Sequence, residues 1–454
     1  MTAPDKIFKN TWICQPETHK VQPVFGDIHI SDGKISSVIA KDFNVFLNDR
    51  GAKRRKPLPF ERDLGGRVLT LPLVNFHDHF YSRLAKGLPA AGPQNNFLQI
   101  LENLWWKLDQ QLDEDMIRAS VHLSALDCVR HGVTTVFDHH ASPRTTRRIL
   151  NVISDTLREH GLRGVLCLET SDRHGVLQAE EVLQENRNFI QQHTDSDIRG
   201  MLGLHAPFTL SDETLRAASQ ILQDLSTAVH IHLAEDRHEM EYSQKNFGIT
   251  PTQRLEKFQL LTPQTILGHG IYLSESDYQL IARHHSAIAY NPDSNMNNAV
   301  GLPEYSQAPL DIPILPGTDG MHANIARTLK QLFLLYRHQG HSFSESFRWI
   351  GKIYFDSYLF VKHLFPDFTT LQPGDRADLV VWDYVPPTPF SGENFWGHWI
   401  YGILEAPVQT VVQGGEVLLD DKEWRKINPD DLYPEISQHG ERLFRLFQKL
   451  VKKL

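Results

Sequence analysis

The sequence predicts an α/β fold, a (β/α)8 TIM-like barrel with a small β-sandwich domain built from both chain ends. Two observations favour this class. From about Leu71 onward, apolar segments of strand length alternate eight times with helical segments, which is typical of a parallel barrel with helices outside. Short apolar runs separated by turn residues occur before and after this region. An open doubly wound sheet is the alternative, but no glycine-rich phosphate loop supports it.

The first 70 residues have the pattern of short strands joined by turns. Asp32-Gly33 lies between the apolar runs Ile28–Ile30 and Ile35–Ala40, and Asp-Gly in such a place is a strong signal for a β-hairpin. The segment Lys41–Asp63 interrupts the pattern and contains the basic run Lys53–Lys56. We interpret this run as a solvated loop rather than a patch for nucleic acid or targeting.

Eight apolar segments are expected to form the barrel strands. Their expected last residues are His79, Asp138, Glu169, His205, Glu235, His269, Asn291 and Asp319. The helical segments between them include Phe97–Arg130, Thr145–Glu159, Ala179–Gln192, Asp212–Asp224 and Glu275–Arg283. Because the carboxyl ends of barrel strands meet at one mouth, these polar residues should converge on one site.

Strand patterns return after the barrel, at Gly374–Trp382 and in a hairpin from Val408 to Leu419. We therefore expect residues 1–70 and 368–454 to form the small β domain with a C-terminal helix, and residues 71–367 to form the barrel. We expect the C-terminal helix to pack on the barrel or on a second subunit rather than on a membrane. Its apolar stripe comprises Leu443, Phe444, Phe447, Leu450, Val451 and Leu454.

Composition excludes several classes of protein. A net charge of −9 argues against binding to a phosphate backbone. The three cysteines, Cys14, Cys128 and Cys167, show no paired spacing, which favours a reducing compartment over a disulfide framework. No apolar stretch approaches the ~18 residues of a membrane span. We expect a cytoplasmic protein with a small-molecule substrate and neither a nucleic-acid nor a membrane partner.

Histidines at the strand ends suggest a metal site. His77 and His79 are two residues apart, so that both would point to one face of a strand. A His-x-His pair alone is weak evidence, but His232 and Asp319 would complete a set of three nitrogens and one oxygen. Such a set suits one Zn or Fe(II) ion and leaves a position for water. A bound ion can lower the pKa of water from 15.7 to about 7.

Two further residues are candidates for proton transfer. Glu235 follows His232 by three residues, where it could reach a substrate without ligating the metal and could carry a proton. A glutamate favoured by a helix N-terminus is the alternative, and the proximity of His232 argues against it. His269 ends the next strand, where it could orient the attacking water and stabilise developing charge.

Other residues are candidates for contacting the substrate. His205 ends the fourth strand, where a two-metal enzyme would offer a bridging carboxylate or modified lysine, so histidine there favours a single ion. His139 and His140 follow the second strand, where we expect one of them to line the pocket, and Trp105, Trp106 and Arg173 are weaker candidates. For the two tryptophans, burial between helices is the alternative. His230 shares a strand face with His232 and is a less favoured metal ligand.

Together these residues resemble the amidohydrolase superfamily, specifically its deaminase and chlorohydrolase branch. The matching segments are Leu73–His79, His131–Thr135, His205–Phe208, His230–Glu235, Asn291–Asn295, Gly317–Gly320 and Pro373–Leu379. Within this branch the sequence is most similar to the SsnA-type aminohydrolases. That similarity is carried by Leu101–Leu108, Asp138–Pro143, Glu169–Arg173, Asn295–Gly301 and Tyr384–Pro389.

The resemblance implies roles for individual residues. His77, His79, His232 and Asp319 match the metal ligands of the family. Glu235 and His269 match its residues for proton transfer and water polarisation, Asp319 would also accept the proton of the water, and His205 matches a substrate contact. The implied reaction is hydrolytic deamination of a purine-like or pyrimidine-like heterocycle by a metal-bound hydroxide, and relatives of this fold suggest a homodimer.

Two alternatives stay open at this point. The same residues could open a cyclic amide ring, because the hydrolysis of a lactam needs the same nucleophile and proton carriers. A non-catalytic metal-binding scaffold is the alternative from another class of protein. Intact Glu235, His269 and Asp319 argue against it, because loss of function would be expected to damage at least one of them.

Overall fold

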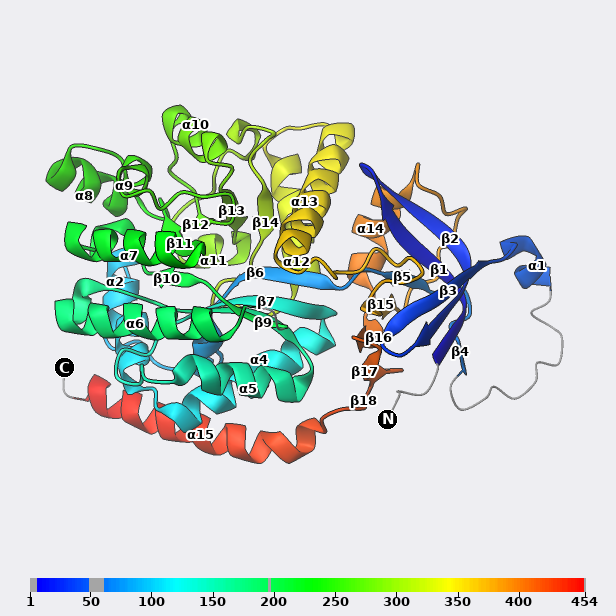
Figure 1. Cartoon of the computed structure of the whole chain (residues 1–454), viewed down its shortest axis with the longest axis horizontal. Coiled ribbons are helices and arrows are strands. Elements are labelled where there is room, and N and C mark those ends of the chain that lie inside the picture. The colour runs from blue at the N-terminus through cyan, green and yellow to red at the C-terminus, as the bar shows by residue number, and fades with distance from the viewer. Residues whose placement is uncertain (1–5, 49–60, 195–196, 453–454) are drawn as a thin grey trace. The chain divides into compact units, whose positions relative to one another are not determined.

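The computed structural model describes residues 6–48, 61–194 and 197–452 (Figure 1). The basic run at residues 53–56 lies outside these residues. The described residues form two compact units. One unit holds the described residues up to Val74 together with Cys128–Thr134 and Phe333–Asn428, and the other holds Asn75–Asp127, Thr135–Leu332 and the residues from Pro429. None of the described helices is long and apolar enough to cross a membrane.

The first unit is built around a mixed sheet, mainly antiparallel, to which strands from the N-terminal and C-terminal parts of the chain contribute. The N-terminal strands are β1 (Lys6–Glu17), β2 (Lys20–Ser31), β3 (Lys34–Ala40), β4 (Glu61–Asp63) and β5 (Val68–Thr70). The C-terminal strands are β15 (Leu379–Trp382), β16 (Val408–Gln413), β17 (Glu416–Asp420) and β18 (Glu423–Trp424). Among the described residues their order is β18-β17-β16-β15-β5-β1-β2-β3, and β4 pairs with β1. The pairing of β5 with β15 joins the two ends of the chain.

The expected hairpin at Asp32-Gly33 joins β2 to β3. Both residues have positive φ, 50° for Asp32 and 76° for Gly33, as a type I′ turn requires. The helices α1 (Phe43–Asn48), α13 (Phe343–Leu364) and α14 (Phe395–Tyr401) also belong to this unit.

The second unit contains most of a barrel of parallel strands. Its first four strands are β6 (Leu73–Asp78), β7 (Val133–His140), β8 (Arg163–Leu168) and the pair β9 (Ile198–Gly200) and β10 (Leu202–Leu204), which only Met201 separates. The others are β11 (Val229–Leu233), β12 (Ile266–His269), β13 (Ala287–Tyr290) and β14 (Ile314–Pro316). Two isolated parallel bridges, Thr170 with Leu204 and Asp78 with Asp319, join the two parallel sheets into a ring.

Helices surround this ring of strands (Figure 1). They are α4 (Glu114–Arg130), α5 (Ile149–His160), α6 (Val176–Gln192), α7 (Asp212–Leu225), α8 (Arg237–Phe247), α9 (Pro251–Lys257), α10 (Glu275–Arg283), α11 (Pro292–Asn297) and α12 (Ile325–His338). Nearly all residues of the barrel strands are buried, which explains why they appear in the sequence as continuous apolar runs. The predicted fold class, a barrel with a separate β domain from the chain ends, is confirmed.

The expected helix Phe97–Arg130 is wrong as a single element. It divides into α2 (Phe97–Ile100), the π-helical segment η2 (Leu101–Trp105), α3 (Trp106–Leu108), the 3-10 turn η3 (Asp109–Gln111) and α4. The break occurs because Leu112 is extended, with φ −75° and ψ 129°. The Asp113 side chain then accepts a hydrogen bond from the backbone N–H of Met116 at 3.1 Å and caps the start of α4.

The C-terminal helix α15 (Pro429–Val451) falls in the barrel unit, whereas the sequence analysis groups it with the small β domain. It packs on the turn η1 (Phe80–Ala85), and Arg442 pairs with Asp113. Its buried face comprises Ile436, His439, Leu443 and Phe447, a spacing of three and four residues that forms one line. Phe444 and Val451 of the expected stripe are each 37% exposed because they lie off this line, and Leu454 lies outside the described residues.

Candidate metal and catalytic site

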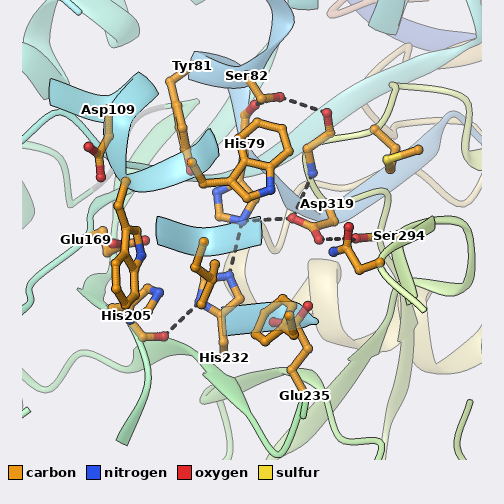
Figure 2. Close-up of a pocket in the computed structure, with 17 residues that line it drawn as sticks. His79, Tyr81, Ser82, Asp109, Glu169, His205, His232, Glu235, Ser294 and Asp319 are labelled. Atoms are coloured by element: carbon orange, nitrogen blue, oxygen red, sulfur yellow. Dashed lines mark hydrogen bonds and ion pairs between the residues drawn. The ribbon is translucent and has the colours of Figure 1, made fainter. Parts of the chain in front are cut away.

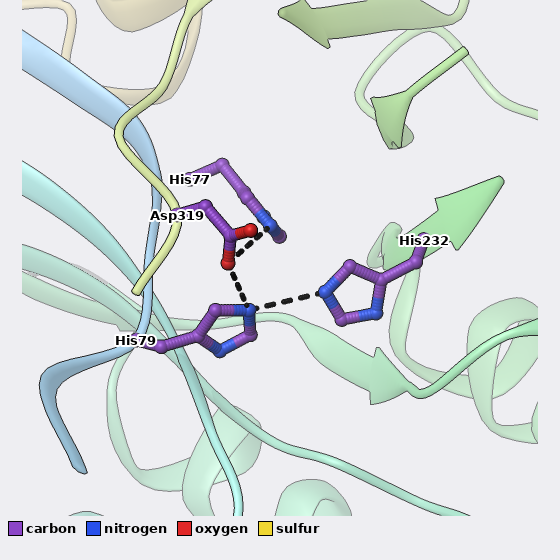
Figure 3. A group of neighbouring side chains, drawn as sticks. All are labelled: His77, His79, His232 and Asp319. Carbon is purple, nitrogen blue, oxygen red and sulfur yellow. Dashed lines mark hydrogen bonds and ion pairs between the residues drawn. The ribbon is translucent and has the colours of Figure 1, made fainter. Parts of the chain in front are cut away.

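The expected metal ligands meet at the carboxyl ends of three strands. His77 and His79 are carried by the end of β6, His232 by β11, and Asp319 by the segment after β14 (Figure 3). One ligand atom from each of the four lies within 4.8 Å of the others. Nε2 of His79 is 3.0 Å from Oδ1 of Asp319 and 3.1 Å from Nε2 of His232. Nε2 of His77 is 3.8 Å from the same Asp319 oxygen.

Hydrogen bonds to backbone carbonyls fix a proton on Nδ1 in two of these histidines, His79 and His232. Nδ1 of His79 donates to the backbone carbonyl of His139 at 2.5 Å, and Nδ1 of His232 donates to the carbonyl of His205 at 2.7 Å. The two Nε2 atoms face each other across 3.1 Å, and that of His79 also faces Oδ1 of Asp319 at 3.0 Å. Two lone pairs at this distance repel each other unless a proton or a cation lies between them.

His77 presents its Nε2 to the same centre. This atom is buried and has no hydrogen-bond partner among the described residues. Its Nδ1 is 2.7 Å from Nε2 of His230, so His230 holds the ring from behind and does not face the centre. Three imidazole nitrogens and a carboxylate oxygen that converge in this way fit a divalent ion such as zinc.

The pKa values of His79 and Asp319 also reflect the close approach of the two side chains. Burial favours the neutral form of His79, but its hydrogen bond to Asp319 outweighs this and raises its pKa to about 9. Burial likewise opposes the charge on Asp319, yet the hydrogen bond and charge of His79 hold its pKa well below the ordinary value. A divalent ion would replace the proton that these two side chains share, because a metal competes with protons for its ligands.

Asp319 is held in place by its neighbours on the chain and by α11. The backbone N–H of Gly320 donates to Oδ1 at 2.7 Å, and the hydroxyl of Ser294 donates to Oδ2. Asp319 has a φ of 52°, His269 at the end of β12 has 74°, and Ala234 directly after β11 has 51°. Positive φ is unfavourable for residues other than glycine and concentrates at functional sites.

Glu235 and His269 flank the four candidate metal ligands, which we call the metal-ligand group (His77, His79, His232 and Asp319). Nε2 of His269 is 3.5 Å from Oε2 of Glu235 and 3.9 Å from Oδ2 of Asp319. Nδ1 of His269 is 2.8 Å from Oδ1 of Asn295, which assigns its proton to Nδ1 and leaves the Nε2 lone pair toward the two carboxylates. Burial, together with the negative charge of Asp319, raises the pKa of Glu235 well above its usual value. Glu235 is therefore suited to enter the reaction as a protonated acid.

Sequence reasoning missed the support behind Glu235. Glu239, in the first turn of α8, is buried, and its carboxylate accepts hydrogen bonds from the backbone N–H groups of Glu235 and Ala234. Burial raises the pKa of Glu239 to about 8. Ser294 and Asn295 were also not assigned roles, although both lie in the Asn291–Asn295 segment. No local pattern distinguishes them, because their partners lie on other strands.

A pocket opens above the metal-ligand group (Figure 2). Its volume of about 620 Å³ includes space that is open to solvent. Four carboxylates line it, namely Asp109, Glu169, Glu235 and Asp319, and the described residues of the lining include no lysine or arginine. The other lining residues are His79, Tyr81, Ser82, Phe97, Leu101, Trp105, Trp106, His205, His232, Ser294, Asn298, Gly320 and Met321.

The four expected substrate contacts fall in different places. His205 and Trp105 line the pocket. His140 is fully buried and does not line it, and its Nε2 is 3.0 Å from the hydroxyl of Ser142. Arg173 lies behind the lining, where its guanidinium pairs with Glu169 at 2.7 Å.

A second group of possible metal ligands lies beside the first and consists of His139, Glu169 and His232. In this group the Glu169 carboxylate already pairs with the guanidinium of Arg173. His139 directs Nε2 at the carbonyl oxygens of Leu204 and His230, at 3.0 and 3.2 Å. The guanidinium of Arg173 already compensates the Glu169 carboxylate. This group is therefore less suited to a metal ion than the set around His79.

Curated relatives are similar to the chain over most of its length. A 5-methylthioadenosine/S-adenosylhomocysteine deaminase of Desulforudis audaxviator is 27% identical over 433 residues, which cover 92% of this chain and 95% of the relative. A 5′-deoxyadenosine deaminase of Methanosphaera stadtmanae is 26% identical over 388 residues, covering 84% and 89% of the two chains.

Solved structures share the fold. An adenosine deaminase from Xanthomonas campestris, solved with bound zinc, superposes with a TM-score of 0.80 at 18% identity and covers 97% of this chain and 98% of its own. An atrazine chlorohydrolase from Arthrobacter aurescens, complexed with zinc, superposes with a TM-score of 0.77 at 20% identity and covers 96% and 99%.

Residues 68–418 match the family described as the amidohydrolase family. The matched region includes all the barrel strands and continues into the C-terminal strands of the small β domain. The resemblance drawn from the sequence, including its deaminase and chlorohydrolase branch, is confirmed. So is the predicted enzyme class, a hydrolase of carbon–nitrogen bonds other than peptide bonds. The chain belongs to the amidohydrolase family.

Proposed function

We propose that the protein is a metal-dependent aminohydrolase that deaminates a purine-like or pyrimidine-like heterocycle. The observation that carries this proposal is the position of Glu235, a buried carboxyl with a raised pKa, beside His269 and next to the four metal ligands. A proton donor next to a nucleophile site is what the removal of an amine from an aromatic ring requires.

Each residue has a defined task in this reaction. A divalent ion held by His77, His79, His232 and Asp319 would supply the Lewis acidity that makes water nucleophilic at neutral pH. Glu235 gives its proton to the ring nitrogen beside the reacting carbon while the water oxygen bonds to that carbon. Asp319 accepts the proton of the water, and His269 orients that water by accepting a hydrogen bond from it at Nε2. The proton held by Asp319 then passes to the exocyclic amine, the bond from carbon to this nitrogen breaks, and ammonia leaves. The proton of the new hydroxyl group returns to Glu235 as the carbonyl forms.

The curated relatives support deamination over ring opening. Both relatives named above are deaminases of adenosine derivatives, so an amino-substituted purine is the first substrate class to test. Lactam hydrolysis would use the same residues, and no residue in the described pocket favours it. A non-catalytic scaffold does not explain why Glu235, His269 and Asp319 remain assembled with their supporting hydrogen bonds.

We also propose one ion per chain, with zinc preferred over Fe(II), and a cytoplasmic homodimer. Zinc is preferred because both solved structures named above were obtained with it. A single ion is preferred because Arg173 occupies the carboxylate of the neighbouring ligand group. Cys14, Cys128 and Cys167 are buried and form no disulfide, which suits a reducing compartment.

The experiment that tests the function measures ammonia release from a panel of amino-substituted purines, nucleosides and pyrimidines by zinc-loaded protein. We expect release from at least one compound and loss of release when a chelator removes the metal. Absorbance at the ring band is followed in the same samples, because opening of the ring would abolish this band without freeing ammonia. Ring opening without ammonia would replace the proposal with the lactam alternative, and neither signal would contradict both.

A further inference from the structure

The two sides of the pocket carry different polar side chains (Figure 2). Glu235, Ser294 and Asp319 lie on one side, and Asp109, Glu169 and His205 lie on the other, with His79 and His232 between them. The chemistry proposed above uses the first side and the centre. It leaves Asp109 and Glu169 without a task, although their side chains are only 2% and 4% exposed.

Buried carboxylates need compensation, and these two share a single cation. Arg173 places Nη2 2.7 Å from Oε1 of Glu169 and Nη1 3.5 Å from Oδ2 of Asp109. Its guanidinium also stacks on the ring of Trp106, 4.6 Å from the ring centroid. Arg173 is therefore the one side chain, among the described residues, that forms an ion pair with both carboxylates. The guanidinium lies behind the pocket wall, outside the lining, and its Nη1 has no hydrogen-bond partner among the described residues.

One acceptor atom on this side is unused. Oδ1 of Asp109 is buried and has no hydrogen-bond partner among the described residues. Burial, opposed by Arg173 and reinforced by the charge of Glu169, raises the pKa of Asp109 to about 7. Asp109 therefore lines the cavity with a buried carboxyl whose charge Arg173 compensates only in part, and a bound cation would favour its ionised form.

We propose that the Asp109–Glu169 side of the pocket binds a cationic nitrogen group of the substrate. The substrates would then be amino-substituted heterocycles that carry an ammonium, amidinium or guanidinium group at the end remote from the reacting carbon. The absence of lysine and arginine from the described pocket lining supports this charge, since nothing there would repel it. The inference rests on the proposed deaminase function only for the identity of the other end of the substrate.

The test uses two small probes of nearly equal shape, cationic benzamidine and neutral benzamide. Their dissociation constants are measured by calorimetry on the zinc-loaded chain at pH 8, where Asp109 is mainly ionised. We expect benzamidine to bind at least about tenfold more tightly, since a hydrogen bond to a charged group is worth roughly that factor or more. Asp109→Asn and Glu169→Gln should each reduce this preference several-fold while benzamide binding stays within about twofold.

A matched control removes a carboxylate elsewhere. Glu275 is exposed on α10 and outside the pocket lining, so Glu275→Gln should keep the full preference for benzamidine. Retained melting temperatures show that each variant is folded, and two independent variants guard against the failure of one. Equal binding of the two probes would overturn the proposal, as would a preference that survives both Asp109→Asn and Glu169→Gln.

The result is distinguishable from a failure of the proposed function. Selective benzamidine binding without ammonia release from any heterocycle would keep the cation subsite and remove the deaminase. Ammonia release with no preference for benzamidine would keep the deaminase and remove the subsite.

Discussion

Replacing Glu235 with glutamine is expected to lower kcat for ammonia release by about 10²- to 10⁴-fold, the usual contribution of general acid catalysis. Glutamine keeps the size and a hydrogen-bonding group of the side chain but has no proton to give to the ring nitrogen. The pocket and the metal ligands should remain intact, because Glu235 is not one of the four convergent ligands around His79. The loss should therefore appear in kcat, with a dissociation constant for substrate near that of the parent chain.

Two comparisons make the Glu235→Gln result specific. Glu275→Gln, which removes an exposed carboxylate from α10, should leave kcat within about twofold. The metal content of Glu235→Gln should equal that of the parent chain, which separates lost proton transfer from lost metal. A Glu235→Gln variant with more than a third of the parent activity would contradict the assigned role.

Substitution of a metal ligand is expected to have the other large effect. His79→Asn and His232→Asn should each weaken zinc binding by at least about 100-fold. Loss of a residue that only forms a hydrogen bond to a metal ligand already lowers metal affinity by about 10- to 100-fold, and loss of the ligand itself should lower it more. His79 has the most central position, with its Nε2 3.0 Å from Asp319 and 3.1 Å from His232. Competition with a chromophoric chelator measures the affinity, and ammonia release should fall in parallel with the occupied fraction.

The control for the ligand variants is a histidine outside the group. His338 is exposed at the end of α12, so His338→Asn should bind zinc with the affinity of the parent chain. Unchanged zinc affinity in both His79→Asn and His232→Asn would show that the ion is held elsewhere or not at all.

The residues predicted best are those that follow a buried strand. His77, His79, His232, His269 and Asp319 could be placed from the sequence because an apolar run identifies each strand. The parallel barrel then brings all strand ends to one mouth. This reasoning needs no knowledge of side-chain contacts, which is why it placed the metal-ligand group and its neighbours together.

The alternation of side chains along β7 explains why His139 and His140 have different surroundings. Neighbouring residues of a strand point to opposite faces. His139 points into the barrel, with its ring centroid 4.8 Å from that of His232, and His140 points away toward Ser142. The sequence shows two adjacent histidines at the end of the strand but does not indicate which of them faces the barrel interior.

Contacts between distant segments also escaped prediction. Asp109 lies in a short 3-10 turn that the sequence shows as part of a long helix, and its relation to Arg173 depends on where that turn folds back. Glu239 supports Glu235 through backbone hydrogen bonds, and Asn295 sets the tautomer of His269. Such partners are determined by tertiary packing, and spacing along the chain carries no information about them.

The measurement that tests the central claim most directly follows one turnover in water enriched in ¹⁸O, using whichever compound of the panel releases ammonia. Hydrolytic deamination predicts a product in which one ¹⁸O atom replaces one amino group, with one equivalent of ammonia and an intact ring. The label should appear only with metal-loaded protein that retains Glu235. A product that has gained ¹⁸O while keeping all its nitrogen would contradict the account, as would labelling that is equally fast after removal of the metal.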